Sequence, residues 1–263
     1  MTRELELSNL SIQLKKIADA GWIENRRSGN DGGVGNTLED LLEVTENNYS
    51  LPDIGEWEIK AQRSTTTSLL TLVHNEPEPR IARLVPRLLL PYYGWQHAEA
   101  GKLYPETERS FRQTLYGLKA SGRGFYLVIN YVTERVEVHF DASKVDTSMH
   151  SEWLADVESK VGLGDLDPIP YWTFELLEEK LTNKLNNMLY FRAKTKRVEG
   201  TEFYNYEGFH ALVDPTLENF LKLLEEGVVA FDFDARTGHN HGTKIRMRRE
   251  SVRDLYSNQI DID

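Results

Sequence analysis

The stretch NTLEDLLEVTENNYSLPDIGEWEIK, from Asn36 to Lys60, decides how this chain folds. Its last four residues, from Trp57 to Lys60, alternate between apolar and charged side chains, which is the two-residue period of a half-buried strand. Glu58 and Lys60 are therefore expected on one face, and Trp57 and Ile59 on the opposite face, which packs into a core. A slip of one residue would bury both charges, so this register is well specified.

A pair of carboxylates is expected to converge beside this strand. Asp53 precedes a turn at Gly55 and lies across that turn from Glu58. Mg2+ suits such a pair, because it takes hard oxygen ligands, keeps several waters and needs only two carboxylates plus a substrate phosphate. Lys60 could position the attacking water or stabilise charge that develops on the phosphate. We therefore expect Asp53 and Glu58 to bind Mg2+ in a site for phosphodiester hydrolysis.

The upstream part of the stretch predicts a helix that carries a third carboxylate, Glu39. Asn36 or Thr37 can cap this helix, and Glu39 or Asp40 can close a capping box. Leucines at helical spacing begin at Leu38, so we expect the helix to pack against the strands and to bring Glu39 towards their edge. Glu39 could instead serve only the capping box, and Glu-x-Lys also occurs by chance on solvated strands.

Helical and strand patterns interleave along the rest of the chain, without internal repeats. Apolar spacing predicts helices over residues 5–20, 173–189 and 215–227. Alternating patterns predict hairpins over residues 125–141, 190–209 and 227–249. Residues 61–73 are expected to form the third strand of the catalytic sheet, with Gln62 in phase with Glu58 and Lys60. This mixture favours a mixed α/β architecture.

Composition limits the class of protein. With 263 residues the chain can form one large domain or two lobes that share a core. Hydrophobic residues make up 40% and aromatic residues 10%, which argues against disorder. No apolar run has the length of a membrane-spanning helix, and the lack of cysteine excludes disulfides and thiolate metal sites. We expect a cytoplasmic protein with no membrane partner.

The net charge of −11 is unusual for a protein that binds DNA, because phosphate contacts normally come from Lys and Arg. Basic residues nevertheless cluster along the chain, at Arg26–Arg27, Arg80–Arg87, Arg109–Arg123, Lys194–Arg197 and Lys244–Arg253. Acidic residues concentrate elsewhere. We expect a basic cleft on an acidic body, although charge runs are usually ordinary solvated faces.

A second polar cluster surrounds the loop TGHNH near the C-terminus. His239, His241, Lys244 and Arg246 flank a predicted hairpin, a shape that can enter the major groove of DNA. Arg can donate two hydrogen bonds to guanine O6 and N7, and a histidine can donate to either atom. The histidines could instead bind zinc, although no cysteine ligand exists, or form a plain polar loop.

These segments resemble a known family. The run GNDGGVGNTLEDLLEVTENNYSLPDIGEWEIKAQRSTTTSLLTL resembles the MvaI/BcnI family of type II restriction endonucleases, which is related to the repair nicking enzyme MutH within the PD-(D/E)xK nuclease superfamily. The segment HNHGTKIRM resembles a family segment that contributes to DNA recognition. By this resemblance the active site consists of Glu39, Asp53, Glu58 and Lys60, and DNA is read by His239, His241, Lys244 and Arg246.

The resemblance also implies an architecture and partners. It implies a PD-(D/E)xK restriction-endonuclease-like core with a mixed sheet flanked by helices, and two lobes that form a DNA-binding cleft. We expect a catalytic lobe over residues 1–122 and a DNA-recognition lobe over residues 123–263. The implied enzyme is a monomer that needs Mg2+, cuts double-stranded DNA at a GC-rich, CCNGG-like site and works beside a cognate DNA methyltransferase. A MutH-like nicking enzyme and a DNA-binding module without catalysis remain alternatives.

Overall fold

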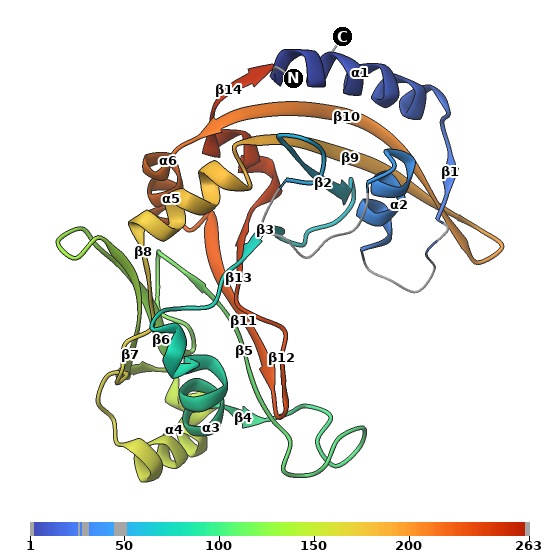
Figure 1. Cartoon of the computed structure of the whole chain (residues 1–263). Helices are drawn as coiled ribbons and strands as arrows, with labels where there is room; N and C mark the ends of the chain where they lie inside the picture. Colours follow the sequence, from blue (N-terminus) through green and yellow to red (C-terminus); the bar gives the residue numbers. More distant parts are fainter. Residues whose placement is uncertain (1–2, 26, 28–31, 45–51, 261–263) are drawn as a thin grey trace. The chain divides into compact units, whose positions relative to one another are not determined.

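The computed structural model describes residues 3–25, 27, 32–44 and 52–260, and it has the expected mixed α/β character with several sheets (Figure 1). The chain divides into two compact units. The first unit comprises Met1–Ser68, Glu179–Thr216 and Val252–Asp263, and the second unit comprises Leu69–Glu178 and Leu217–Ser251. A single boundary near residue 122 does not describe these units, because the first unit takes strands from both halves of the chain. The division of catalysis and DNA recognition between two lobes stays a prediction.

A five-stranded sheet forms the centre of the first unit. Its elements are α1 (Arg3–Asp19), β1 (Ile23–Glu24), α2 (Gly33–Leu41), β2 (Trp57–Arg63), β9 (Asn187–Val198), β10 (Thr201–Pro215) and β14 (Tyr256–Ile260). The strand order is β1-β10-β9-β2, with β14 paired to β10. The pairing of β2 with β9 is parallel, and the other pairs are antiparallel. The sheet is therefore mixed, as predicted for the core.

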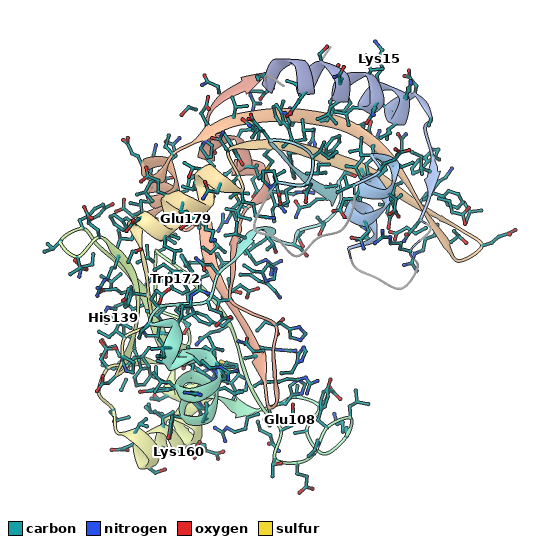
Figure 2. All side chains as sticks on the ribbon, in the orientation of Figure 1. Lys15, Glu108, His139, Lys160, Trp172 and Glu179 are labelled. Atoms are coloured by element: carbon teal, nitrogen blue, oxygen red, sulfur yellow. The ribbon has the colours of Figure 1, made fainter. Side chains whose placement is uncertain are left out.

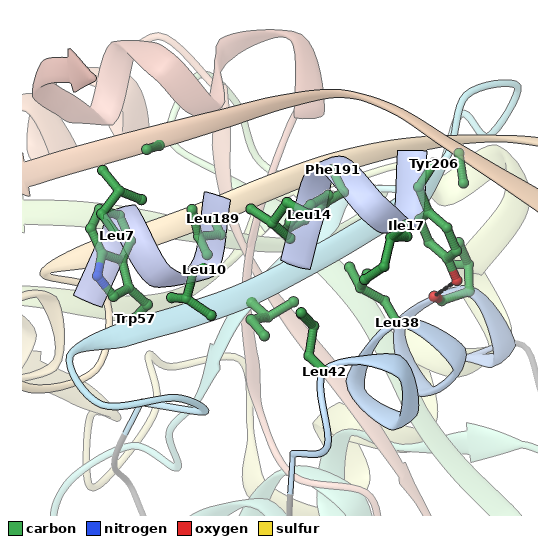
Figure 3. Close-up of a cluster of buried hydrophobic side chains, with 14 of the residues drawn as sticks. Leu7, Leu10, Leu14, Ile17, Leu38, Leu42, Trp57, Leu189, Phe191 and Tyr206 are labelled. Atoms are coloured by element: carbon green, nitrogen blue, oxygen red, sulfur yellow. Dashed lines mark hydrogen bonds between the residues drawn. The ribbon is translucent and has the colours of Figure 1, made fainter. Parts of the chain in front are cut away.

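Helices α1 and α2 bury their apolar side chains against this sheet (Figure 3). From α1 these side chains are Leu7, Leu10, Leu14 and Ile17, which confirms the helix predicted over residues 5–20. Trp57 and Ile59 of β2 join the same cluster, and both are almost completely buried. A hydrogen bond of 2.7 Å from the Tyr206 hydroxyl to the Val34 carbonyl ties β10 to α2. One face of β2 is thus fixed in the core.

Helix α2 begins earlier than the sequence pattern predicts. It starts at Gly33, and the preceding residue, Gly32, makes no side-chain capping hydrogen bond. Thr37 is buried within the helix, and its hydroxyl lies 3.5 Å from Asn25 Oδ1. The predicted cap at Asn36 or Thr37 and its capping box are therefore wrong, because the chain is already helical before these residues.

The second unit contains two further sheets. Its strands are β3 (Leu70–His74), β4 (Trp95–Gln96), β5 (Arg109–Tyr116), β6 (Arg123–Asn130), β7 (Arg135–Val145), β8 (Tyr171–Thr173), β11 (Val229–Arg236), β12 (His239–Asn240) and β13 (Lys244–Met247). One sheet has the order β3-β13-β11-β5-β4 with β12 on β11, and the other has the order β6-β7-β8. The hairpins predicted over residues 125–141 and 227–249 are confirmed as β6-β7 and β11-β13.

The helices of the second unit are the short 3-10 helix η1 (Arg80–Ala82), the π-helix η2 (Val85–Leu89), α3 (Leu90–Tyr93), α4 (Thr147–Val161) and α6 (Leu217–Glu225). Two more helices, α5 (Phe174–Asn183) and the 3-10 helix η3 (Arg249–Leu255), include residues of both units. Helix α5 is shorter than the helix predicted over residues 173–189, because the chain enters β9 at Asn187. None of the helices in the described ranges combines the length and apolar character that a membrane span requires.

Aromatic side chains fill the interior of the second unit. Trp172 of β8 (labelled in Figure 2) is completely buried. Its ring centroid lies 4.3 Å from that of Phe231 on β11. Its indole N–H donates to the Asn75 carbonyl at 2.9 Å, so this buried donor is satisfied. The rings of Phe111 and Phe125 extend the cluster with an edge-to-face contact at 5.4 Å. Phe111 of β5 and Phe231 of β11 thus face the interior of the second unit.

The segment predicted as the third strand of the catalytic sheet divides between the two units. Strand β2 continues to Arg63, and the following strand, β3, pairs with β13 in the second unit. The prediction that residues 61–73 form one strand of the catalytic sheet is therefore wrong. The reason is that a turn after β2 takes the chain into another sheet before the next apolar run begins.

Leu38 provides a test of the packing between α2 and the sheet. Its side chain is completely buried, so Leu38→Ala should lower the free energy of unfolding by about 2–5 kcal/mol through lost apolar contact and a residual cavity. Leu41→Ala on the same helix is the control, because Leu41 is 37% exposed and should change stability by less than about 1 kcal/mol. Urea denaturation measures both variants, and equal losses would contradict the packing described for α2.

Candidate active site

Strand β2 carries the two charged residues of the motif on one face. Glu58 pairs with Met188 and Lys60 with Tyr190 in the parallel register between β2 and β9. Because Trp57 and Ile59 occupy the core face, both charged side chains leave the strand on the other face. The Lys60 ammonium donates a hydrogen bond to Glu58 Oε1, as expected for neighbours on one face.

Asp53 is held beside this strand by the turn that precedes it. Ile54 and Trp57 form an antiparallel bridge around Gly55, which has a φ of 55°, a value that favours glycine. The Asp53 carboxylate accepts a hydrogen bond of 2.8 Å from the Ile59 amide. It also lies close enough to Glu58 to affect the ionisation of that residue. The structure therefore brings Asp53, Glu58 and Lys60 together.

Glu58 is more deeply buried than a half-buried strand would predict. Only 1% of its side chain is exposed. Burial raises the pKa of Glu58 above the ordinary value of a glutamate, because the charged form loses hydration. Lys60 opposes this shift, Asp53 adds to it, and a second lysine, Lys184, opposes it. Burial has the larger effect, so the ionised carboxylate depends on nearby positive charge.

Lys184 is a member of this cluster that the sequence patterns do not indicate. Its ammonium lies 3.3 Å from Glu58 Oε2, as an ion pair without hydrogen-bond geometry. Lys184 follows α5 and precedes β9, so it reaches Glu58 because β9 lies beside β2. No motif near residue 60 could have predicted a partner from this distant part of the chain.

Two further polar side chains lie near the motif. Gln62 is buried. Its side-chain oxygen accepts a hydrogen bond of 3.1 Å from the Tyr190 hydroxyl, and its side-chain nitrogen lies 3.5 Å from the Ser68 backbone carbonyl. A role for Gln62 at the scissile phosphate thus stays a prediction. Burial and the charge of Glu58 raise the pKa of Tyr256 well above its ordinary value, so this tyrosine stays protonated.

Glu39 lies on α2, the helix that packs directly against β2. It follows Leu38, which is in the core, and its own side chain is partly buried. This position agrees with the expected location near the edge of the strands. Its part in the catalytic cluster stays a prediction.

The donor set around Glu58 fits a hard divalent cation. Asp53 and Glu58 supply carboxylate oxygens, and the buried Oε2 of Glu58 accepts no hydrogen bond. In the described part of the chain, no three His, Cys, Asp or Glu side chains converge as a ready metal cage. Mg2+ needs no such cage, because it keeps several waters and uses one or two carboxylates together with substrate phosphate.

The predicted recognition segment lies on the outward face of the large sheet in the second unit. Arg246 of β13 donates to Asp232 at 2.8 Å and to the Leu69 carbonyl at 2.9 Å. Lys244 donates to Asp234 at 3.1 Å. Both basic side chains are therefore oriented by carboxylates from the neighbouring strand β11.

Asp234 is shared between two cations. Arg112 of β5 lies 2.8 Å from one of its oxygens, and Lys244 bonds the other. Although burial acts in the opposite direction, Lys244 and Arg112 lower the pKa of Asp234. The alternation in FDFDAR could have indicated that Asp232 and Asp234 share the outward face of β11.

His239 and His241 are exposed at the hairpin tip. Their rings meet edge to face with centroids 4.2 Å apart. Glu76 supports the tip from outside the hairpin, because one of its oxygens accepts a hydrogen bond of 2.7 Å from the Thr243 amide. The zinc alternative gains no support, since the described residues contain no group of three candidate ligands.

The raised pKa of Glu58 has a consequence for the metal-free protein. The folded state binds a proton at Glu58 more tightly than the unfolded state does. The free energy of unfolding should therefore fall as pH rises from the ordinary glutamate pKa through the raised pKa of Glu58. Glu58→Gln should remove this part of the decrease. Urea denaturation across pH in the presence of a chelator measures it.

The control for this experiment is Glu56→Gln, which changes an exposed neighbour on the same turn. The decrease attributed to Glu58 should remain in this variant. If Glu58→Gln also retained this decrease, burial would not control the ionisation of Glu58.

Comparison with known proteins gives this geometry a context. A search of curated proteins found no match. Two solved structures are similar over the whole chain at 24% sequence identity. The complex of restriction endonuclease MvaI with its cognate DNA substrate has a TM-score of 0.78, and the alignment covers 100% of this chain and 100% of that chain. MvaI in the absence of DNA has a TM-score of 0.56, with 100% of this chain and 99% of that chain covered. These likenesses show an MvaI-like fold.

The family comparison covers nearly the same length. Residues 12–256 match the model of the MvaI/BcnI restriction endonuclease family, a stretch that includes the Glu58 cluster of the first unit and the hairpin segment of the second unit. The chain therefore belongs to the MvaI/BcnI restriction endonuclease family.

Proposed function

We propose that this restriction endonuclease is a type II enzyme that uses Mg2+ to cut double-stranded DNA at a short, GC-rich, CCNGG-like site. The observation that carries the proposal is the buried Glu58 carboxylate beside Asp53, with ammonium groups on both of its oxygens. A carboxylate with 1% exposure is unfavourable unless positive charge compensates it, and such sites are typical of catalytic centres.

The residues of the first unit have distinct proposed roles. Asp53 and Glu58 hold Mg2+ through carboxylate oxygens, and Glu39 supplies a supporting acid. Bound Mg2+ would supply Lewis acidity towards a phosphoryl oxygen. Lys60 orients the attacking water and stabilises negative charge that develops on the phosphate, because its ammonium lies on the same strand face as Glu58.

The proposed recognition residues are His239, His241, Lys244 and Arg246. Arg246 has a fixed guanidinium, because Asp232 and a backbone carbonyl both accept its hydrogen bonds. A guanidinium held in this way is suited to donate to guanine O6 and N7 in the major groove. The DNA bound to MvaI in its solved complex supports DNA as the partner of this chain as well.

We also propose the setting in which the enzyme works. It would act as a monomer in the cytoplasm, with a cognate DNA methyltransferase that modifies the same site as its functional partner. The net charge of −11 would weaken non-specific DNA binding, so that base contacts dominate. The basic clusters would add phosphate contacts, so binding to the target site would weaken as salt concentration rises.

Lys60→Ala should abolish cleavage and preserve binding to the target site. Incubation with unmethylated phage DNA and Mg2+, followed by sequencing of fragment ends, measures cleavage and reveals the site. Lys15→Ala is the control, because Lys15 is an exposed lysine on α1 and should cut normally. Cleavage retained by Lys60→Ala would exclude the proposed role, and a chelator that leaves cleavage intact would exclude the metal.

Arg246→Ala should weaken the binding free energy for the target site by about 1–3 kcal/mol. It should also relax discrimination between bases at one base pair of the site. Its matched control is Arg248→Ala, because Arg248 is an exposed arginine just beyond the same strand. Competition binding against duplexes with single base-pair changes measures both variants. An equal and uniform loss with all duplexes would identify Arg246 as a phosphate contact instead.

A further inference from the structure

Both oxygens of the Glu58 carboxylate are in contact with ammonium groups. Lys60 donates to Oε1, and Lys184 lies 3.3 Å from Oε2. A cation that binds Glu58 needs at least one of these oxygens. Metal binding therefore brings a divalent cation next to at least one of these ammonium groups, and their repulsion favours displacement of a lysine from the carboxylate. The structure distinguishes the two candidates.

Two lysines offset the negative charge of Asp53 and Glu58 in the metal-free protein. Asp53 and Glu58 carry two negative formal charges, and Lys60 and Lys184 carry two positive ones. The side chains of both lysines are 22% exposed, whereas Glu58 is only 1% exposed. The lysines thus reach a buried carboxylate from positions that are themselves in contact with solvent. They provide the positive charge that such a carboxylate requires.

The two lysines differ in how their backbone is held. Lys60 lies within β2, where it is paired with Tyr190 of β9, so its Cα position is fixed by the sheet. Lys184 lies in the turn between α5 and β9, and its amide donates to the Lys180 carbonyl at 3.2 Å. The flexible four-carbon side chain of a lysine on such a turn can change rotamers and so move its ammonium away from Glu58. Lys184 is therefore the lysine suited to leave.

We infer that Lys184 is a positioning residue that occupies Glu58 in place of the metal and couples metal binding to DNA binding. The inference rests on the proposed function, since it requires Glu58 to be a metal ligand. In the metal-free protein the Lys184 ammonium lies on Oε2. When a divalent cation takes this oxygen, a phosphate of bound DNA can accept the displaced ammonium.

This exchange makes the two ligands assist each other. Without DNA, the displaced ammonium stays close to the cation, and their repulsion opposes metal binding. With DNA, a phosphate accepts the ammonium, so the same displacement becomes more favourable. The assistance is reciprocal, because a coupling free energy between two sites acts equally on both affinities. The site would consequently stay metal-poor until DNA is present.

The test measures Ca2+ binding by calorimetry, since Ca2+ also takes hard oxygen ligands. Lys184→Met keeps a long unbranched side chain but removes the charge. In the absence of DNA it should bind Ca2+ about tenfold more tightly than the unmodified protein, a change typical of coupled sites. Lys184→Arg keeps the charge and should bind Ca2+ as the unmodified protein does. Lys184→Gln serves as a second neutral variant if Lys184→Met fails to fold, which thermal unfolding reveals.

A matched control lies one helical turn away. Lys180 is 20% exposed, close to the value for Lys184, but its ammonium pairs with Glu179. Lys180→Met should therefore leave Ca2+ affinity unchanged. This control separates a contact at Glu58 from a general loss of positive charge in the first unit.

A second measurement repeats the titrations with a duplex that contains the site found by fragment sequencing. DNA should increase the Ca2+ affinity of the unmodified protein, and this increase should be several-fold smaller for Lys184→Met. Equal Ca2+ affinity and an equal DNA effect in both proteins, with cleavage intact, would overturn the inference alone. No Ca2+ binding by the unmodified protein in either state would overturn the proposed function together with it.

Discussion

The candidate active site depends on the parallel pairing of β2 with β9. This pairing fixes which face of β2 meets the core, because Trp57 and Ile59 must lie under α1 and α2. Glu58 then occupies the opposite face, where it is buried among side chains instead of solvated. A slip of one residue would place the charged side chains in the apolar cluster, so the apolar and the charged residues of β2 enforce the same register.

Burial of Glu58 explains the rest of the cluster. An ionised carboxylate that has lost its hydration needs nearby cations, and Lys60 and Lys184 supply them from β2 and from the turn before β9. Family membership identifies the chemistry as DNA phosphodiester hydrolysis. The same carboxylate that is unfavourable for stability is the one to which the proposed function assigns Mg2+. Strain of this kind at a functional site is common in enzymes.

The second unit uses acidic residues to orient basic ones. Asp232 bonds Arg246, and Asp234 bonds both Lys244 and Arg112 across three adjacent strands. This arrangement explains how a chain with a net charge of −11 can present fixed cations on one sheet face. Cations that are held in place before binding lose less conformational freedom when they contact DNA.

Local patterns alone determined much of this protein: the alternation from Trp57 to Lys60, the main hairpins, and the family motifs that name Glu58 and Lys60. Only the tertiary structure decided that α2 begins at Gly33, where the Tyr204 hydroxyl lies 2.7 Å from the position that a Cβ would take. It also decided that β3 pairs with β13 instead of joining the five-stranded sheet of β2, and that Lys184 reaches Glu58. The physical reason is that periodicity reports the faces of one element, whereas burial and partners depend on which distant strands pair.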